Sequence, residues 1–154
     1  LARELAKRTE RIAIDTDDLI ESLENTTIKK IFKKKGEAYF REREKEISRW
    51  LKKSVKDTII SIGGGFYQVG NLQKIGHVIY LESSFDAILE RIHACDNAEN
   101  KLKKRPLLQD MKKAKKLMDK RHPEYLACAD TVIHTAGKSS AQIAKEIIDL
   151  LKIQ

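Results

Sequence analysis

The sequence has no apolar run near the roughly 20 residues needed to cross a bilayer, and LARELAKRTER at its start lacks the apolar core of a secretory signal. Its two cysteines, Cys95 and Cys128, have neither the spacing of a zinc site nor that of a disulfide framework. Aromatic residues make up only 6% of the chain, without the aromatic run of RNA-binding sheets. These absences argue against a membrane protein, a secreted protein and a nucleic-acid binder, and predict reduced cysteines in a cytoplasmic protein.

The chain also lacks internal repeats, low-complexity tracts and any linker rich in proline, glycine and serine. Its 154 residues, 41% hydrophobic and 35% charged, fit one globular domain over 1–154. The 31 lysines and arginines outnumber 23 acidic residues, and the formal net charge of +8 suits an anionic partner: phosphate, nucleic acid or a carboxylated metabolite. Charge alone does not choose among these partners.

Four short apolar runs rich in β-branched residues predict strands at Ile12–Ile14, Thr58–Ile62, Val78–Leu81 and Thr131–His134. Helical patterns separate them, and the helix after the third run has Ser84 available as its N-cap. This alternation predicts an α/β fold with a parallel sheet.

Two other segments have distinct patterns. Residues 36–53 predict one long helix, and Trp50 within it, like Met111 further on, falls on a helical period that predicts a core position. The segment from 95 to 110 loses the apolar period and is strongly basic. Active-site lids have this composition, and so do ordinary surface loops.

The first candidate site is Asp15-Thr16-Asp17, at the end of the first expected strand. Ligand sites in open α/β sheets lie along the carboxyl edge, where one carboxylate could hold Mg²⁺ through water and the other could orient or deprotonate a hydroxyl. Alternatively, Thr16 or Asp17 only caps the following helix. The pattern by itself leaves both interpretations open.

The second candidate is the triplet Gly63–Gly65, which follows the second expected strand and would let backbone amides approach a ligand closely. The third is Arg105, which closes the basic segment, together with Arg121 on the next helix. Guanidinium groups match carboxylates and phosphates, although either arginine alone would be read as solvated surface charge.

Two weaker patterns are set aside. The GKS at Gly137–Ser139 resembles part of a phosphate-binding loop, but Val132 stands where that loop requires its first glycine, so we predict a turn and a helix cap. The four histidines lack the mutual spacing of metal ligands and predict structural or surface roles: His77, His93, His122 and His134.

Taken in order, five motifs resemble those of the shikimate kinase family over nearly the whole chain. They are DTD at Asp15–Asp17, FREREKE from Phe40, SIGGG at Ser61–Gly65, RPLL from Arg105 and KR at Lys120–Arg121. The resemblance implies a three-layer α/β/α fold of the P-loop kinase type. It also implies ATP-dependent phosphorylation of the 3-hydroxyl of shikimate, on the route to chorismate and the aromatic amino acids.

The resemblance further implies roles in the chemistry. Asp17 would hold the shikimate hydroxyls and act as base or orienter for the attacking one, and Asp15 would hold magnesium through water. Arg105 would move in with a lid at about 95–110 and neutralise charge on the transferred phosphoryl group. Arg91 would reach the nucleotide phosphates, and Lys138 lies in the loop that covers adenine.

Shikimate itself would be bound by a helical region at about 16–53, the glycine triplet and one later arginine. Arg41 and Arg121 would bind its carboxylate, and Glu44, on the same helix face as Arg41, would position that guanidinium. The three glycines would approach the substrate, the middle one through its backbone amide: Gly63, Gly64 and Gly65.

The start of the chain departs from the family pattern. The family opens with an apolar strand, central to a five-stranded sheet, and a GxxGxGK[ST] loop, whereas LARELAKRT resembles the helix after that loop. We therefore expect the natural protein to have an N-terminal portion before Leu1, and an intact mass of 17.7 kDa would contradict this.

Three alternatives to a monomeric shikimate kinase remain open. A related kinase could phosphorylate a nucleoside monophosphate or gluconate, although Arg41, Gly64 and Arg121 suit a small carboxylated polyol better. A non-catalytic binding module would bind shikimate without hydrolysing ATP. A nucleic-acid binder rests only on the net charge and the KLKKR run.

Overall fold

The computed structural model describes residues 1–94 and 110–153. The chain divides into two compact units, Leu1–His77 with Ser140–Gln154 and Val78–Ser139. The four strands in the described residues pair in two two-stranded parallel sheets, one in each unit. Parallel pairs joined through helices confirm the α/β class, while the single domain over 1–154 stays a prediction.

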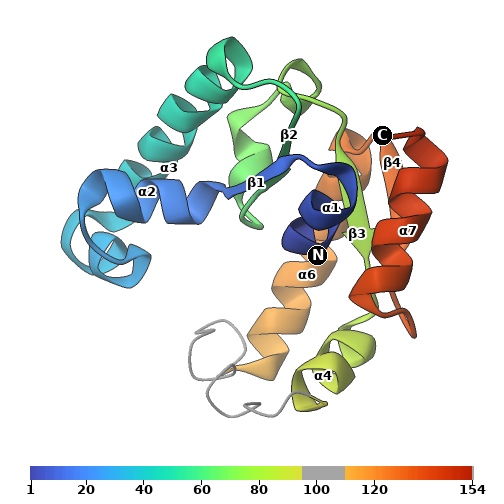
Figure 1. Cartoon of the computed structure of the whole chain (residues 1–154). Helices are drawn as coiled ribbons and strands as arrows, with labels where there is room; N and C mark the ends of the chain where they lie inside the picture. Colours follow the sequence, from blue (N-terminus) through green and yellow to red (C-terminus); the bar gives the residue numbers. More distant parts are fainter. Residues whose placement is uncertain (95–109, 154) are drawn as a thin grey trace. The chain divides into compact units, whose positions relative to one another are not determined.

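The first unit is built on β1 and β2, which run side by side (Figure 1). Its elements are α1 (Ala2–Thr9), β1 (Ile12–Asp15), α2 (Thr16–Glu24), α3 (Ile28–Ser54), β2 (Thr58–Ser61), the short 3₁₀ helices η1 (Phe66–Val69) and η2 (Leu72–Lys74), and α7 (Ser140–Leu151). The register pairs Ile12 with Thr58 and Asp15 with Ser61. The carboxyl ends of both strands therefore lie level, at the edge where the DTD and glycine motifs begin.

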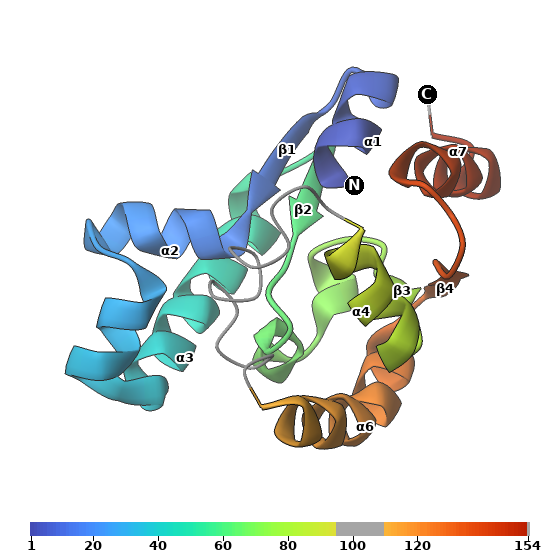
Figure 2. The same cartoon turned by 90° about the horizontal axis from the view of Figure 1, so that it is seen from below.

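Helices α2 and α3 connect β1 to β2 and lie against each other (Figure 2). Asn25 ends α2 in the left-handed conformation, and Glu21 of α2 accepts a hydrogen bond from the backbone N–H of Ile28 at 2.7 Å, at the start of α3. Gly36 interrupts α3 with φ 81° and ψ 174°, a backbone conformation that is essentially restricted to glycine. The helix predicted over 36–53 is thus the second part of a longer, kinked element.

The core of the first unit consists of apolar side chains from its helices and from η1 and η2. They are Leu5, Ile20, Ile31, Phe40, Ile47, Leu51, Phe66, Leu72, Ile143, Ala144 and Ile147. The prediction that Trp50 is a core residue is wrong, because 46% of its surface is exposed while its neighbour Leu51 is fully buried. One step along a helix turns a side chain by about 100°, so Leu51 takes the inward position.

The second unit contains two helices and the second pair of parallel strands. Its elements are β3 (Ile79–Glu82), α4 (Phe85–His93), α6 (Met111–Cys128) and β4 (Thr131–His134). Ser84 caps α4 as predicted, accepting from the backbone N–H of Ala87 at 3.1 Å, and Asp110 caps α6 in the same way through Lys113 at 3.0 Å. Met111, expected in the core, is 39% exposed because it lies at the first residue of α6.

The four strands begin and end within one residue of the ranges predicted from the sequence. Runs of β-branched residues are a local signal, so the strands could be predicted without knowing which side chains are buried. No helix in the described part of the chain is long and apolar enough to cross a membrane.

Leu51→Ala should lower the free energy of unfolding by about 2–5 kcal/mol, because it removes a fully buried side chain and leaves a cavity. Leu150→Ala is the matched control, since that leucine is 57% exposed and its loss should change stability by less than about 0.5 kcal/mol. Urea denaturation measures both. Equal losses in the two variants would contradict this placement of the core.

Candidate active site

Asp15 joins the ends of β1 and β2. Its Oδ1 accepts hydrogen bonds from the backbone N–H groups of Asp17 at 2.8 Å and Asp18 at 3.4 Å, so Asp15 is the N-cap of α2. Its Oδ2 accepts from the hydroxyl of Ser61 at 2.7 Å. The interpretation of Thr16 or Asp17 as the cap is therefore wrong, because Asp15 alone has the extended backbone of a capping residue.

Asp17 lies in the first turn of α2 and is only partly exposed. Burial, reinforced by the negative charges of Asp15 and Glu44, raises the pKa of its carboxyl from 3.8 to about 6. A carboxylate with a pKa close to neutrality is suited to accept a proton from a hydroxyl. Its environment thus distinguishes Asp17 from an ordinary surface aspartate in a helix N-terminal turn.

Arg41, on the second part of α3, is held by carboxylates on both sides. Glu44 accepts from its Nη1 at 2.5 Å, and Glu37 accepts from Nε at 3.3 Å and from Nη2 at 2.9 Å. The Glu44 side chain is only 2% exposed, and that of Arg41 is 18% exposed. Burial by itself lowers the pKa of Arg41, but the bonds to Glu44 and Glu37 outweigh it and raise the pKa above its ordinary value.

The glycine triplet lies directly against both charged side chains. A Cβ at position 63 would lie 2.9 Å from Oδ1 of Asp17, and a Cβ at position 65 would lie 2.6 Å from Nη2 and 2.8 Å from Cζ of Arg41. The N–H of Gly63 also points to the hydroxyl of the fully buried Thr16 at 3.4 Å. The missing side chains therefore make room for the protein's own carboxylate and guanidinium.

The other predicted residues in the described chain belong to the second unit. Arg121 lies partly buried on α6. Arg91 of α4 donates through Nη2 to the backbone carbonyls of Thr135 at 2.8 Å and Lys138 at 2.7 Å, and so holds the turn that contains Lys138. Gly137 adopts φ 69° there, which agrees with the predicted turn.

Arg105 and all but the last residue of the lid expected at about 95–110 lie outside the described residues. The structure therefore brings together Asp15, Asp17, Arg41, Glu44 and the glycine triplet, all in the first unit. These residues offer a carboxylate with a raised pKa and a guanidinium, both against one loop of glycines. A ligand with a hydroxyl and a carboxylate would match these two groups.

A family model described as shikimate kinase matches residues 1–152. The chain belongs to the shikimate kinase family. The Helicobacter hepaticus shikimate kinase is 32% identical over 98% of this chain and 87% of its own length, and the Persephonella marina one is 39% identical over 90% and 82%. The solved structure of the Acinetobacter baumannii shikimate kinase in complex with shikimate is 31% identical over 98% and 84%, with a TM-score of 0.80.

The similarity confirms the family and the P-loop kinase fold that the five motifs indicated. The sequence assigned no role to Ser61, which bonds Asp15, or to Glu37, which bonds Arg41. Ser61 stands in the quoted SIGGG motif, and its pairing with Asp15 follows from the parallel register. Glu37 lies four residues before Arg41, the spacing of ion pairs along a helix, so that signal could have been found.

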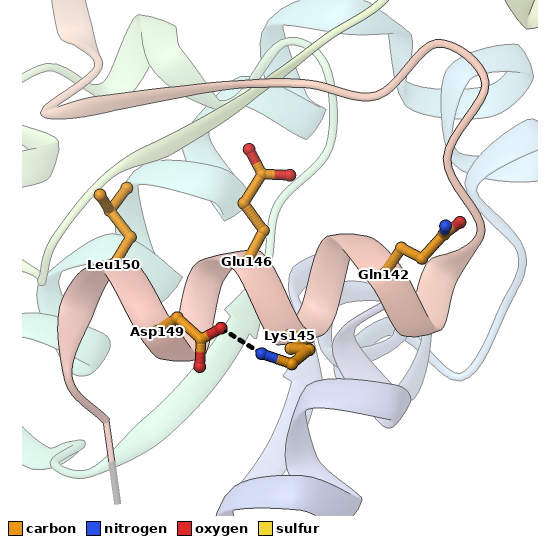
Figure 3. Close-up of a pocket in the computed structure, with 5 residues that line it drawn as sticks. All are labelled: Gln142, Lys145, Glu146, Asp149 and Leu150. Atoms are coloured by element: carbon orange, nitrogen blue, oxygen red, sulfur yellow. Dashed lines mark hydrogen bonds and ion pairs between the residues drawn. The ribbon is translucent and has the colours of Figure 1, made fainter.

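Two surface hollows among the described residues are lined by residues other than those of the candidate site. One is a shallow surface lined only by α7 residues, Gln142, Lys145, Glu146, Asp149 and Leu150, with Lys145 and Asp149 paired at 2.5 Å (Figure 3). Another, in the second unit, borders Glu82, which His134 contacts at 2.5 Å and His122 at 3.4 Å. These contacts fit the structural role predicted for the histidines, and residues 1–94 and 110–153 contain no group of three potential metal ligands.

Asp17→Asn should stabilise the protein at neutral pH and less so in acid. Since the folded pKa of about 6 lies above the ordinary 3.8, the folded state binds this proton more tightly, and Asp17 costs stability increasingly as the pH rises through that window. An asparagine has no charge to desolvate. Thermal unfolding at about pH 4 and about pH 8 measures the difference.

The control is Asp18→Asn, at the exposed neighbouring position. It should leave the pH dependence of the melting temperature nearly unchanged. An equal effect of Asp17→Asn at both pH values would contradict the raised pKa.

Proposed function

We propose that this protein transfers the terminal phosphoryl group of ATP to the 3-hydroxyl of shikimate, giving shikimate 3-phosphate and ADP, a cytoplasmic step on the route to chorismate. Its membership of the shikimate kinase family supports the reaction. The single observation that carries the proposal is the placement of Asp17 and Arg41 against one glycine loop. Shikimate has the hydroxyl and the carboxylate that these two groups would recognise.

Asp17 would accept the hydroxyl proton as the oxygen attacks phosphorus. Its pKa of about 6 leaves most molecules ionised at neutral pH, while it remains basic enough to take up a proton in the transition state. Arg41 would bind the substrate carboxylate bidentately, together with Arg121. Because Glu37 and Glu44 already fix the guanidinium, little side-chain freedom is lost on binding.

The backbone amide of Gly64 would hold the substrate between these two groups. Arg91 and Lys138 would face the nucleotide, and Arg105 would neutralise charge on the phosphoryl group in transit. The protein would act as a monomer. Phosphoryl transfer depends mainly on positioning and charge stabilisation, which are the contributions that these residues can make.

Magnesium fits at Asp15. A carboxylate has about four acceptor positions, and Asp17, Asp18 and Ser61 use all but one, which leaves a place for a metal-bound water. Mg²⁺ characteristically keeps several waters and binds through one or two carboxylates. The ion would neutralise charge on the phosphates of ATP.

The decisive experiment is coupled ADP release with ATP and magnesium, with and without shikimate, on full-length protein whose first residue has been checked by intact mass. Shikimate-dependent release is expected. Asp17→Asn should lower kcat by about 10²–10⁴-fold while ATP binding persists, and Asp18→Asn should stay within a few-fold of wild type. Binding of shikimate without ADP release would favour the binding module, and release with gluconate instead would overturn the acceptor.

The two outer glycines should affect different kinetic constants. Gly65→Ala displaces Arg41, so the KM for shikimate should rise by about 10-fold or more, whereas Gly63→Ala displaces Asp17 and should lower kcat by about 10–100-fold. Gly76→Ala is the control, because a Cβ there meets nothing within 4 Å. Steady-state kinetics with varied shikimate would separate the effects, and the same pattern in all three variants would refute them.

A further inference from the structure

A polar cluster lies at the far end of α2 from Asp17 and joins three segments of the chain. Glu24, the last residue of α2, accepts from Nζ of Lys35 through Oε2 at 2.7 Å and from the hydroxyl of Tyr39 through Oε1 at 2.7 Å. Lys35 also donates to the Tyr39 hydroxyl at 3.0 Å, and its Nζ lies 4.2 Å from the centre of that ring. All three polar groups are therefore linked to one another.

The members of this cluster stand on opposite sides of the kink at Gly36. Lys35 ends the first part of α3, and Tyr39 lies in the first turn of the second part. Gly36 itself places no restraint on the angle, because glycine has wide backbone freedom and a Cβ there would meet nothing within 4 Å. The angle between the two parts must be fixed by contacts that cross the kink, and the cluster supplies two of them, Glu24 with Tyr39 and Lys35 with Tyr39.

A further contact across the kink joins two aromatic rings. The rings of Phe32 and Phe40 lie with their centres 4.9 Å apart, one in each part of α3. This contact is less directional than the hydrogen bonds of the cluster, and Phe32 is itself 37% exposed. The Glu24, Lys35 and Tyr39 contacts therefore provide the more specific restraint.

The cluster is charge-assisted, which strengthens its bonds. Hydrogen bonds from Lys35 and Tyr39 lower the pKa of Glu24, and the bonds to Glu24 and Tyr39 raise the pKa of Lys35. The Glu24 side chain is only 10% exposed. Both groups thus stay ionised over the whole neutral range, where their ion pair keeps both charges.

The cluster restrains the second part of α3, which carries Arg41. Glu37, the first residue after the kink, and Arg41, two residues beyond Tyr39, form the ion pair that orients Arg41. At the other end, Glu24 belongs to the same helix as Asp17. The relative position of Asp17 and Arg41 therefore depends on the angle between α2 and the second part of α3.

We propose that Glu24, Lys35 and Tyr39 are positioning residues that fix Arg41 relative to Asp17 and so set the distance between hydroxyl and carboxylate that the site accepts. This inference rests on the proposed function, because it assigns the carboxylate of shikimate to Arg41. None of the three residues needs to touch the substrate. Their effect should appear in the recognition of the carboxylate and not in the chemical step.

The test is Tyr39→Phe in the full-length enzyme, which removes one hydroxyl and keeps the ring. The KM for shikimate should rise by about 3- to 10-fold, with kcat within about twofold of wild type and the KM for ATP unchanged. Glu24→Gln, which keeps an acceptor for Tyr39 but loses the ion pair with Lys35, should give a smaller change of the same kind. Glu42→Gln is its control, because it breaks an exposed 2.8 Å pair with Lys45 on the same helix.

A double-mutant cycle shows whether the effect passes through Arg41. In an Arg41→Gln background, Tyr39→Phe should no longer change the KM for shikimate. An equal change in both backgrounds, or an unchanged KM in the wild-type background, would overturn the inference while leaving the proposed function intact. Wild-type protein that neither releases ADP with shikimate nor binds it by calorimetry would overturn both.

Discussion

The site depends on the absence of side chains at two positions of one short loop. Gly63 and Gly65 allow a carboxylate and a guanidinium to approach the same stretch of backbone from two different helices. A side chain at either position would occupy the volume that Asp17 or Arg41 now fills. Both charged side chains therefore pack against the same loop. The strands, the cap of α2 and the kinked α3 together place Asp17 and Arg41 there.

The residues around the glycine loop are largely acidic, whereas the whole chain is basic. The chain carries a formal charge of +8, yet burial and the negative charges of Asp15 and Glu44 raise the pKa of Asp17. Arg41 is shared between Glu37 and Glu44 and offsets part of this local negative charge. These ion pairs orient the guanidinium of Arg41. They also weaken the repulsion that the nearby carboxylates would exert on an anionic substrate.

Much of this arrangement could be predicted from the sequence, and the exceptions have physical reasons. The strands, the cap at Ser84 and the Arg41–Glu44 pair follow from local periodicity and spacing, so they were found directly. The outward position of Trp50 and the contacts of Tyr39 with Glu24 depend on how helices pack against one another, which spacing within one segment does not reveal. The family motifs pointed to the candidate site residues, whose roles stay a prediction, whereas the raised pKa of Asp17 required knowledge of its burial.

The bond between Ser61 and Asp15, two residues 46 positions apart in sequence, ties the candidate site to the alignment of β1 and β2. If β2 slid by two residues along β1, its side chains would keep their faces, but Gly63 or Ile59 would stand opposite Asp15 in place of the serine, depending on the direction. The aspartate would lose its hydroxyl donor, and the glycine loop would move away from both charged groups. Insertions and deletions between Thr58 and Gly65 should therefore be rare among related sequences, because each one would shift Ser61 or the glycine loop relative to Asp15.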